Sequence, residues 1–95
     1  MRTGTTTSGF VFQFDEARAD DMRLVDLIST TMDEDAGEFE KLSASSKVIE
    51  LLLGKEQKAA LFAHIGQSHD GRVPFAVLEK TLTEIMQGGG DALKN

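Results

Sequence analysis

Three phenylalanines at alternate positions, Phe10, Phe12 and Phe14, place the strongest constraint on how this chain can fold. A period of two puts their side chains on one face of an extended strand, with Val11 and Gln13 on the other. An isolated strand leaves its backbone hydrogen-bonding groups without partners. The segment must therefore pair with another strand, lie against a helix, or pair with a second molecule.

Helical spacing of apolar residues follows the phenylalanine strand and predicts a mainly α-helical chain. Asp15 has the chemistry of an N-cap, which predicts a first helix over residues 15–30. A second helix is predicted over residues 38–53, with Phe39 on its buried side, and the weak helix formers of "SASSK" leave a break there as an alternative. We expect the buried side of the first helix to carry Met22, Leu24, Val25, Leu27, Ile28 and Met32.

Two glycines and one proline are predicted to fix the turns between the later helices. Gly54 stands between "ELLL" and "KEQKAALFAHI", where a positive φ can end one helix and redirect the chain into a third. Gly71 follows Asp70 and supplies the positive φ of a turn. Pro74 suits the first position of a helix, where its missing N–H costs nothing. The third helix is expected to bury Leu61, Phe62 and Ile65.

The last predicted helix has the most regular apolar spacing in the chain. Phe75, Leu78, Leu82 and Ile85 recur at offsets of three, four and three. The predicted fold is a small bundle of about four helices preceded by one short extended N-terminal strand. We expect a flexible N-terminus over residues 1–9, one helical domain over residues 10–87, and a flexible glycine-rich tail over residues 88–95.

Composition excludes several classes of function. Sixteen acidic residues against ten basic ones give a net charge of −6, which is unsuited to binding nucleic acid or an anionic membrane. The chain has no cysteine, so disulfides and thiolate chemistry are excluded. It also shows no nucleophile-elbow serine and no phosphate-binding glycine loop opening a helix. We therefore expect neither catalytic residues nor a cofactor.

The stretch "SHDGRVPFAVLEK", residues 68–80, resembles the second half of a calcium-binding EF-hand loop. With Gly71 at position six of such a loop, Ser68 and Asp70 occupy ligand positions three and five. Positions one and twelve, however, fall on Gly66 and Val77, which offer no carboxylate. We therefore expect no metal site. A small regulatory domain with a degenerate, non-binding EF-hand-like loop remains the alternative function.

Histidine and lysine placement argues against two further kinds of site. His64 and His69 lack a third ligand at metal-binding spacing. A helix–turn–helix reading of the C-terminal half would make the last helix contact DNA. That helix offers Lys80 against Glu79 and Glu84, which would repel phosphate.

Apolar residues beyond those that a small core needs are candidates for binding a partner. The last helix carries apolar residues over a wide arc, and the phenylalanine strand has no visible pairing partner. Packing of all these residues within the chain is the alternative, because a chain of this size has a small core. The predicted partner-binding residues are Phe10, Phe12, Phe14, Phe75, Val77, Leu82 and Met86.

The order of these motifs resembles the small tail assembly chaperones of long-tailed bacteriophages and prophages. The resemblance covers roughly residues 9–95. Its most specific part is the run "LLLGKEQKAAL" followed by "DGRVPFAVLEKTLTEI". Within that run, Leu51–Gly54 with Glu56 and Gln57, and then Asp70–Pro74, carry the match through their order and spacing.

The resemblance implies a non-enzymatic function in viral tail assembly. Members of this family are thought to keep the tape-measure protein soluble and to help recruit tail-tube subunits. It thus implies these two proteins as partners, with self-association left open. It further implies action in the host bacterial cytoplasm and absence from the mature virion. A frameshifted, longer product is common in the family, and the tail over residues 88–95 lies where such a fusion would begin.

Overall fold

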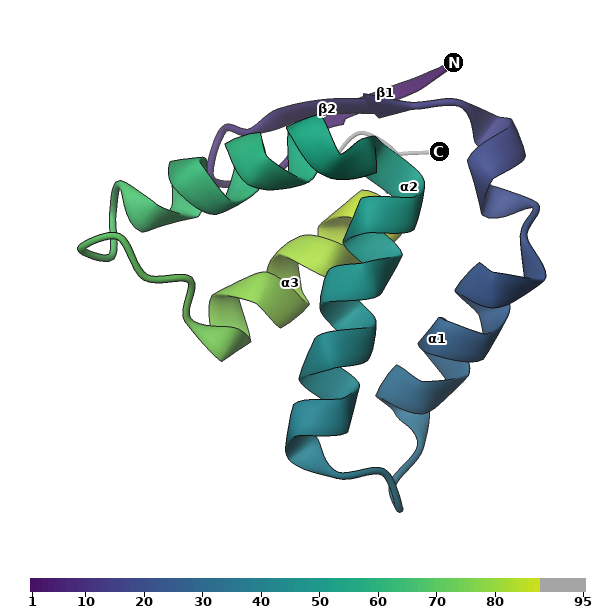
Figure 1. Cartoon of the computed structure of the whole chain (residues 1–95). Coiled ribbons are helices and arrows are strands. Elements are labelled where there is room, and N and C mark those ends of the chain that lie inside the picture. The colour runs from purple at the N-terminus through teal and green to yellow at the C-terminus, as the bar shows by residue number, and fades with distance from the viewer. Residues whose placement is uncertain (88–95) are drawn as a thin grey trace.

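The computed structural model describes residues 1–87 and shows a mainly helical protein with a small sheet at one end. In Figure 1 the two strands lie across the top of the helices, α1 runs beside the first half of α2, and α3 crosses behind α2. The elements are β1 (Arg2–Thr5), β2 (Val11–Phe14), the 3₁₀ helix η1 (Glu16–Ala19), α1 (Met22–Met32), α2 (Glu38–Gly66) and α3 (Phe75–Met86).

The phenylalanine strand pairs with the N-terminus of its own chain. β1 and β2 are antiparallel, with Gly4 opposite Phe12. The connection is closed by a bond from the Thr6 amide to the Phe10 carbonyl, 2.9 Å long, and turns at Gly9, whose φ is 94°. The prediction of a single strand is therefore wrong, because Arg2–Thr5 forms the pairing partner of β2. This strand lies within the segment 1–9 that was predicted to be flexible.

Two aspartates break the predicted first helix into two pieces. Asp15 caps η1 by accepting the Ala17 amide, and Asp21 caps α1 by accepting the Arg23 amide, each at 2.9 Å. Arg23 also pairs with the Asp21 carboxylate at 2.6 Å and holds the pKa of that carboxyl below its ordinary value. The helix predicted over residues 15–30 thus becomes η1 and α1.

The face that α1 buries is rotated from the predicted one. Leu24 is buried, and Leu27 and Ile28 are half-buried. Successive helical residues turn by about 100°, so a stripe centred on Leu24 and Ile28 leaves the neighbouring face to solvent. The expectation that Met22, Val25 and Met32 are buried is therefore wrong, since all three are exposed.

The second and third predicted helices are the two halves of one helix, α2, which is kinked at Gly54. Its φ of 84° and ψ of 165° lie in a region that only glycine occupies readily. The "SASSK" segment is continuous helix instead of a break, because Ala44 and Ser45 are buried and their small side chains allow close packing. The predicted four-helix bundle is thus corrected to three α-helices over residues 1–87.

The turn before α3 has the predicted chemistry. Asp70 and Gly71 have φ values of 58° and 83°, and the Gly71 amide donates to the Gly66 carbonyl at 2.8 Å. Pro74 is the N-cap of α3, with φ −61° and ψ 144°, so the helix begins one residue later than expected. The turn redirects the chain from the end of α2 into α3.

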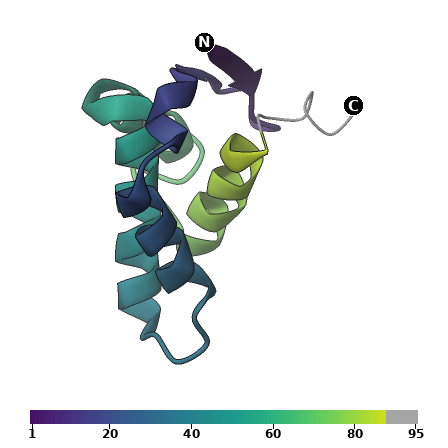
Figure 2. The same ribbon diagram turned by 90° about the vertical axis from the view of Figure 1, so that its right-hand side faces the viewer.

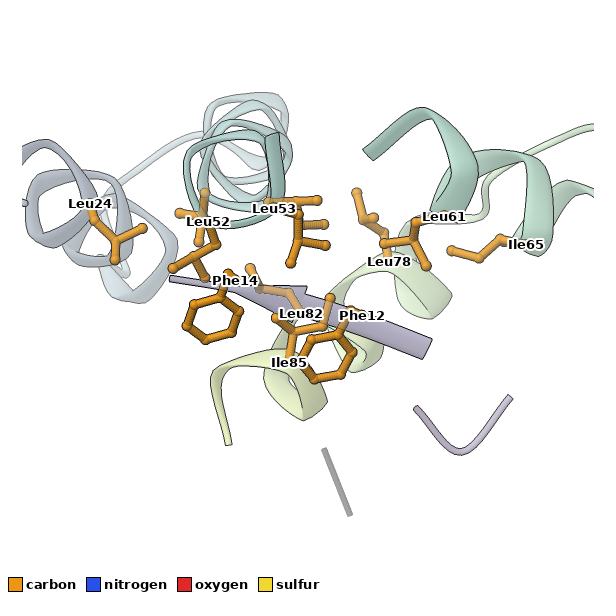
Figure 3. Packing of buried hydrophobic residues seen from close by; sticks show 12 residues of the cluster. Phe12, Phe14, Leu24, Leu52, Leu53, Leu61, Ile65, Leu78, Leu82 and Ile85 are labelled. Carbon is orange, nitrogen blue, oxygen red and sulfur yellow. The ribbon is translucent and has the colours of Figure 1, made fainter. Parts of the chain in front are cut away.

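The core joins the sheet to all three helices. Figure 3 shows Phe12 and Phe14 on β2 pointing into the same layer as leucines and isoleucines from α2 and α3. The rings of Phe12 and Phe14 stack with their centroids 6.3 Å apart. The prediction that the phenylalanines share one face is confirmed. The buried cluster is Phe12, Phe14, Leu24, Val48, Ile49, Leu52, Leu53, Leu61, Ile65, Leu78, Leu82 and Ile85.

Candidate protein-binding site

The predicted partner-binding residues divide into buried and exposed groups. Phe12, Phe14 and Leu82 are buried in the core and offer no surface to another protein. Phe10 and Val77 are half-buried against that core. Only Phe75 and Met86 remain exposed, at 57% and 40% of their surface. The partner-binding prediction therefore rests on α3.

A groove of about 410 Å³ lies between the first half of α2 and α3, and we call it the α2–α3 groove. Figure 2 shows α3 on one side of the pair formed by α1 and α2, whose lower halves project beyond it. The end of α1 and the α1–α2 loop close one side of the groove. Its lining residues are Thr31, Ala36, Glu38, Lys41, Ser45, Glu79, Leu82 and Thr83.

The amino-acid sequence accounts for where this groove is open. The space between the helices near the kink is filled by large side chains such as Phe12, Leu52 and Ile85. Toward the start of α2, the side chains facing the groove are Lys41 and Ser45. Glu38 and Glu79, which also line the groove, are exposed, and carboxylates favour hydration over packing against a neighbouring helix.

An exposed aromatic pair joins the starting ends of α2 and α3. The rings of Phe39 and Phe75 meet edge to face, with centroids 6.5 Å apart and planes at 88°. Phe39 is 79% exposed, so its predicted place on the buried side of the helix is wrong. Its neighbour Glu38 lines the groove, and Phe75 precedes the groove residue Glu79 by one helical turn. The pair therefore lies beside the α2–α3 groove.

Negative charge surrounds the starting end of α2. Residues 33–41, "DEDAGEFEK", carry five carboxylates and a single lysine, Lys41. Carboxylates in the first turn of a helix are favoured by the helix dipole, and Glu40 also accepts the Gly37 amide at 3.3 Å. Glu79 adds a carboxylate from α3. The α2–α3 groove is thus flanked by an excess of negative charge.

The outer edge of β2 is partly closed by a side chain from α2. The Gln57 amide group accepts the Gln13 backbone N–H at 2.9 Å and donates to the Gln13 carbonyl at 2.6 Å. It therefore pairs with β2 as a neighbouring strand would. A second hollow of about 610 Å³ lies beside this contact and the Gly54 kink, lined by polar and apolar groups alike.

The residues considered for metal binding lie apart. His64 approaches the Ser8 carbonyl oxygen at 3.1 Å, and Nδ1 of His69 lies 2.8 Å from the Ile65 carbonyl oxygen. Asp70 belongs to the turn that ends α2. Within residues 1–87 there is no group of three or more histidine, aspartate or glutamate side chains placed to hold a metal ion.

None of the helices in residues 1–87 has the length and apolar character needed to cross a membrane. The predicted tail over residues 88–95 lies outside the described part of the chain.

Sequence reasoning missed the groove because its lining comes from three helices that only the fold brings together. Phe39 could have been suspected, since "GEFEK" surrounds it with carboxylates, which a buried helix face would not carry.

Searches of protein-family models, curated proteins and solved structures found no match to this chain. The resemblance to the tail assembly chaperones therefore rests on the sequence alone. It depends on the two segments Leu51–Gly54 and Asp70–Pro74 and on their spacing. In the structure these segments are the end of the first half of α2 and the turn that leads into α3.

Proposed function

We propose that this protein is a non-enzymatic tail assembly chaperone of a long-tailed bacteriophage or prophage. It binds the tape-measure protein and helps to recruit tail-tube subunits during tail morphogenesis. The order of the sequence motifs suggests the family. The observation that carries the proposal is the exposed Phe39–Phe75 pair beside the α2–α3 groove, a surface suited to binding another protein.

The physical role of such a chaperone is to cover apolar surface on an unassembled partner. Exposed aromatic side chains next to a groove provide contact area that is otherwise hydrated, and its burial favours association. A net charge of −6 keeps the complex soluble through repulsion between copies. In this proposal the protein acts in the host cytoplasm and leaves before the virion matures.

Co-expression tests the proposed function directly. The tape-measure protein encoded by the same phage or prophage is produced in bacteria with this protein or with an empty vector. The soluble fraction of the tape-measure protein should rise markedly only when the chaperone is present. Equal precipitation in both cultures would contradict the proposal.

Gene order supplies an independent check. A tail-tube gene upstream and a very long gene downstream are expected around the gene for this protein. A gene neighbourhood without tail genes would count against the proposed function whatever the outcome of co-expression.

A further inference from the structure

One face of α3 carries two exposed apolar residues, a buried leucine and a carboxylate. Phe75, Glu79, Leu82 and Met86 follow one another at offsets of four, three and four, which places them along one face of the helix. Leu82 and Glu79 line the α2–α3 groove, and Phe75 contacts Phe39 at its end. Phe75 and Met86 are therefore the exposed apolar residues of this face, and Leu82 between them is buried.

The shape of this surface favours a helix as the bound segment. Both long walls of the groove are α-helices, whose backbone groups are already paired, so they offer no edge to which a strand could add. α3 has twelve residues and is about 18 Å long. A ligand helix of about three turns would run along it and place its apolar stripe against the exposed rings of Phe39 and Phe75.

Charge identifies the chemistry of that ligand. The α2–α3 groove contains Glu38 and Glu79 against Lys41, and the preceding loop adds Asp33, Glu34 and Asp35. A helix with lysine or arginine beside its apolar stripe complements this surface, whereas an acidic helix is repelled. A second copy of this chain brings the same acidic face and a net charge of −6, so it is not the complementary occupant.

We propose that the α2–α3 groove, with the Phe39–Phe75 pair, binds a basic amphipathic helix of a partner protein. The inference specifies the surface and the partner chemistry of the proposed chaperone and rests on its being a protein-binding protein. It does not depend on which protein the partner is. The exposed phenylalanines provide apolar contact area, and the carboxylates favour a ligand helix that carries positive charge.

A synthetic peptide tests the groove without knowledge of the natural partner. The probe is a labelled peptide of about 18 residues with leucines on one helical face and lysines on the other. A matched peptide has glutamate in place of each lysine. Fluorescence anisotropy with the full-length protein should give saturable binding of the lysine peptide, and at least about tenfold weaker binding of the glutamate peptide.

Two double variants locate the binding site. Phe39→Ala/Phe75→Ala should weaken binding of the lysine peptide by at least about tenfold, because it removes the exposed aromatic contact. Glu38→Gln/Glu79→Gln should weaken it and reduce its dependence on salt. Met22→Ala is the matched control, since Met22 is an equally exposed helical residue outside the groove lining, and it should bind like the parent.

The inference is overturned by any of three results. These are no saturable binding of the lysine peptide, equal binding of the glutamate peptide, or unchanged affinity in both double variants. Circular dichroism confirms that each variant is folded, and the glutamine variant still decides the question if the alanine variant is not. Peptide failure with a soluble co-expressed tape-measure protein would reject this groove while leaving the proposed function intact. If the lysine peptide binds but the co-expressed tape-measure protein precipitates, the groove is supported and the proposed function is rejected.

Discussion

At the scale of single residues, Gly54 sets the course of the chain more than any other position. It holds φ 84° and ψ 165° in the middle of α2, where every other residue is helical. A side chain at this position would meet Nη1 of Arg18 at 3.3 Å, a contact that a flexible arginine can relieve. The backbone conformation, more than the space, is therefore what requires glycine.

Replacement of Gly54 by valine should lower the free energy of unfolding by roughly 1–3 kcal/mol. A β-branched side chain strongly disfavours positive φ, so the strain persists even if Arg18 moves away. Chemical denaturation monitored by circular dichroism measures the change. Gly37→Ser is the matched control, because Gly37 has negative φ and open space around it. Equal losses in the two variants would contradict the role assigned to the kink.

At the scale of elements, the sheet is small and depends on its neighbours. Two strands of four residues each are marginal by themselves, so β2 is held by the burial of Phe12 and Phe14 and by Gln57 at its outer edge. The Gln57 amide also donates to the Leu53 carbonyl at 2.9 Å. One side chain thereby links β2 to the backbone of α2 beside the kink.

The Gln57→Ala variant should lose about 1 kcal/mol of stability and expose the edge of β2. An open strand edge can pair with another chain, so we also expect association that increases with protein concentration. Urea denaturation and light scattering over a concentration series measure the two effects. Gln67→Ala removes an exposed glutamine side chain at the end of α2 and should change neither quantity.

The elements also show where sequence patterns are informative. α3 and the kink at Gly54 were predicted because apolar spacing and glycine chemistry act locally. β1 was missed because "RTGT" has no apolar alternation, and only Gly4 among its residues is buried. Its assignment comes from pairing with β2, which local pattern does not encode. Asp21 was missed as a cap because Asp15 offered an earlier start for the same helix.

At the scale of the whole molecule, residues near the N-terminus are hydrogen-bonded to α3. The Thr7 amide donates to Glu84 at 2.6 Å, and the Thr7 hydroxyl donates to the same carboxylate at 2.9 Å. The loop after β1 thus contacts α3, while the Ser8 hydroxyl lies 3.3 Å from Nε2 of His64 on α2. These contacts bring residues more than fifty positions apart into one unit.

Deletion of residues 1–8 should lower the free energy of unfolding by at least about 2 kcal/mol, because it removes β1 and both bonds to Glu84. Thermal and urea unfolding measure the loss. The Glu84→Ala variant of the full-length chain removes only the Thr7 contact. Its loss in free energy of unfolding should be smaller than that of the deletion. A truncated chain that unfolds like the parent would show that the N-terminus adds nothing to the fold.

The candidate site was predictable only in part at this scale. Phe75 and Met86 were selected because α3 carries apolar residues over a wide arc. The groove itself depends on how α1, α2 and α3 meet, and its polar lining gives no signal in the sequence. Phe39 was assigned to the core because its spacing from Leu42 fits a buried stripe. In the structure the buried residues of α2 begin at Leu42, and Phe39 is exposed.

The kink in α2 also bears on how the protein opens. It interrupts the helical ladder, and the carbonyls of Leu51 and Leu53 accept side-chain donors, Arg18 at 3.5 Å and Gln57 at 2.9 Å. Arg18 belongs to η1, and Gln57 is bound to β2. We therefore expect local unfolding at the kink to release η1 and the strand pair together. If the first twenty residues and the middle of α2 open as one unit, their backbone amides should exchange with solvent at a common rate.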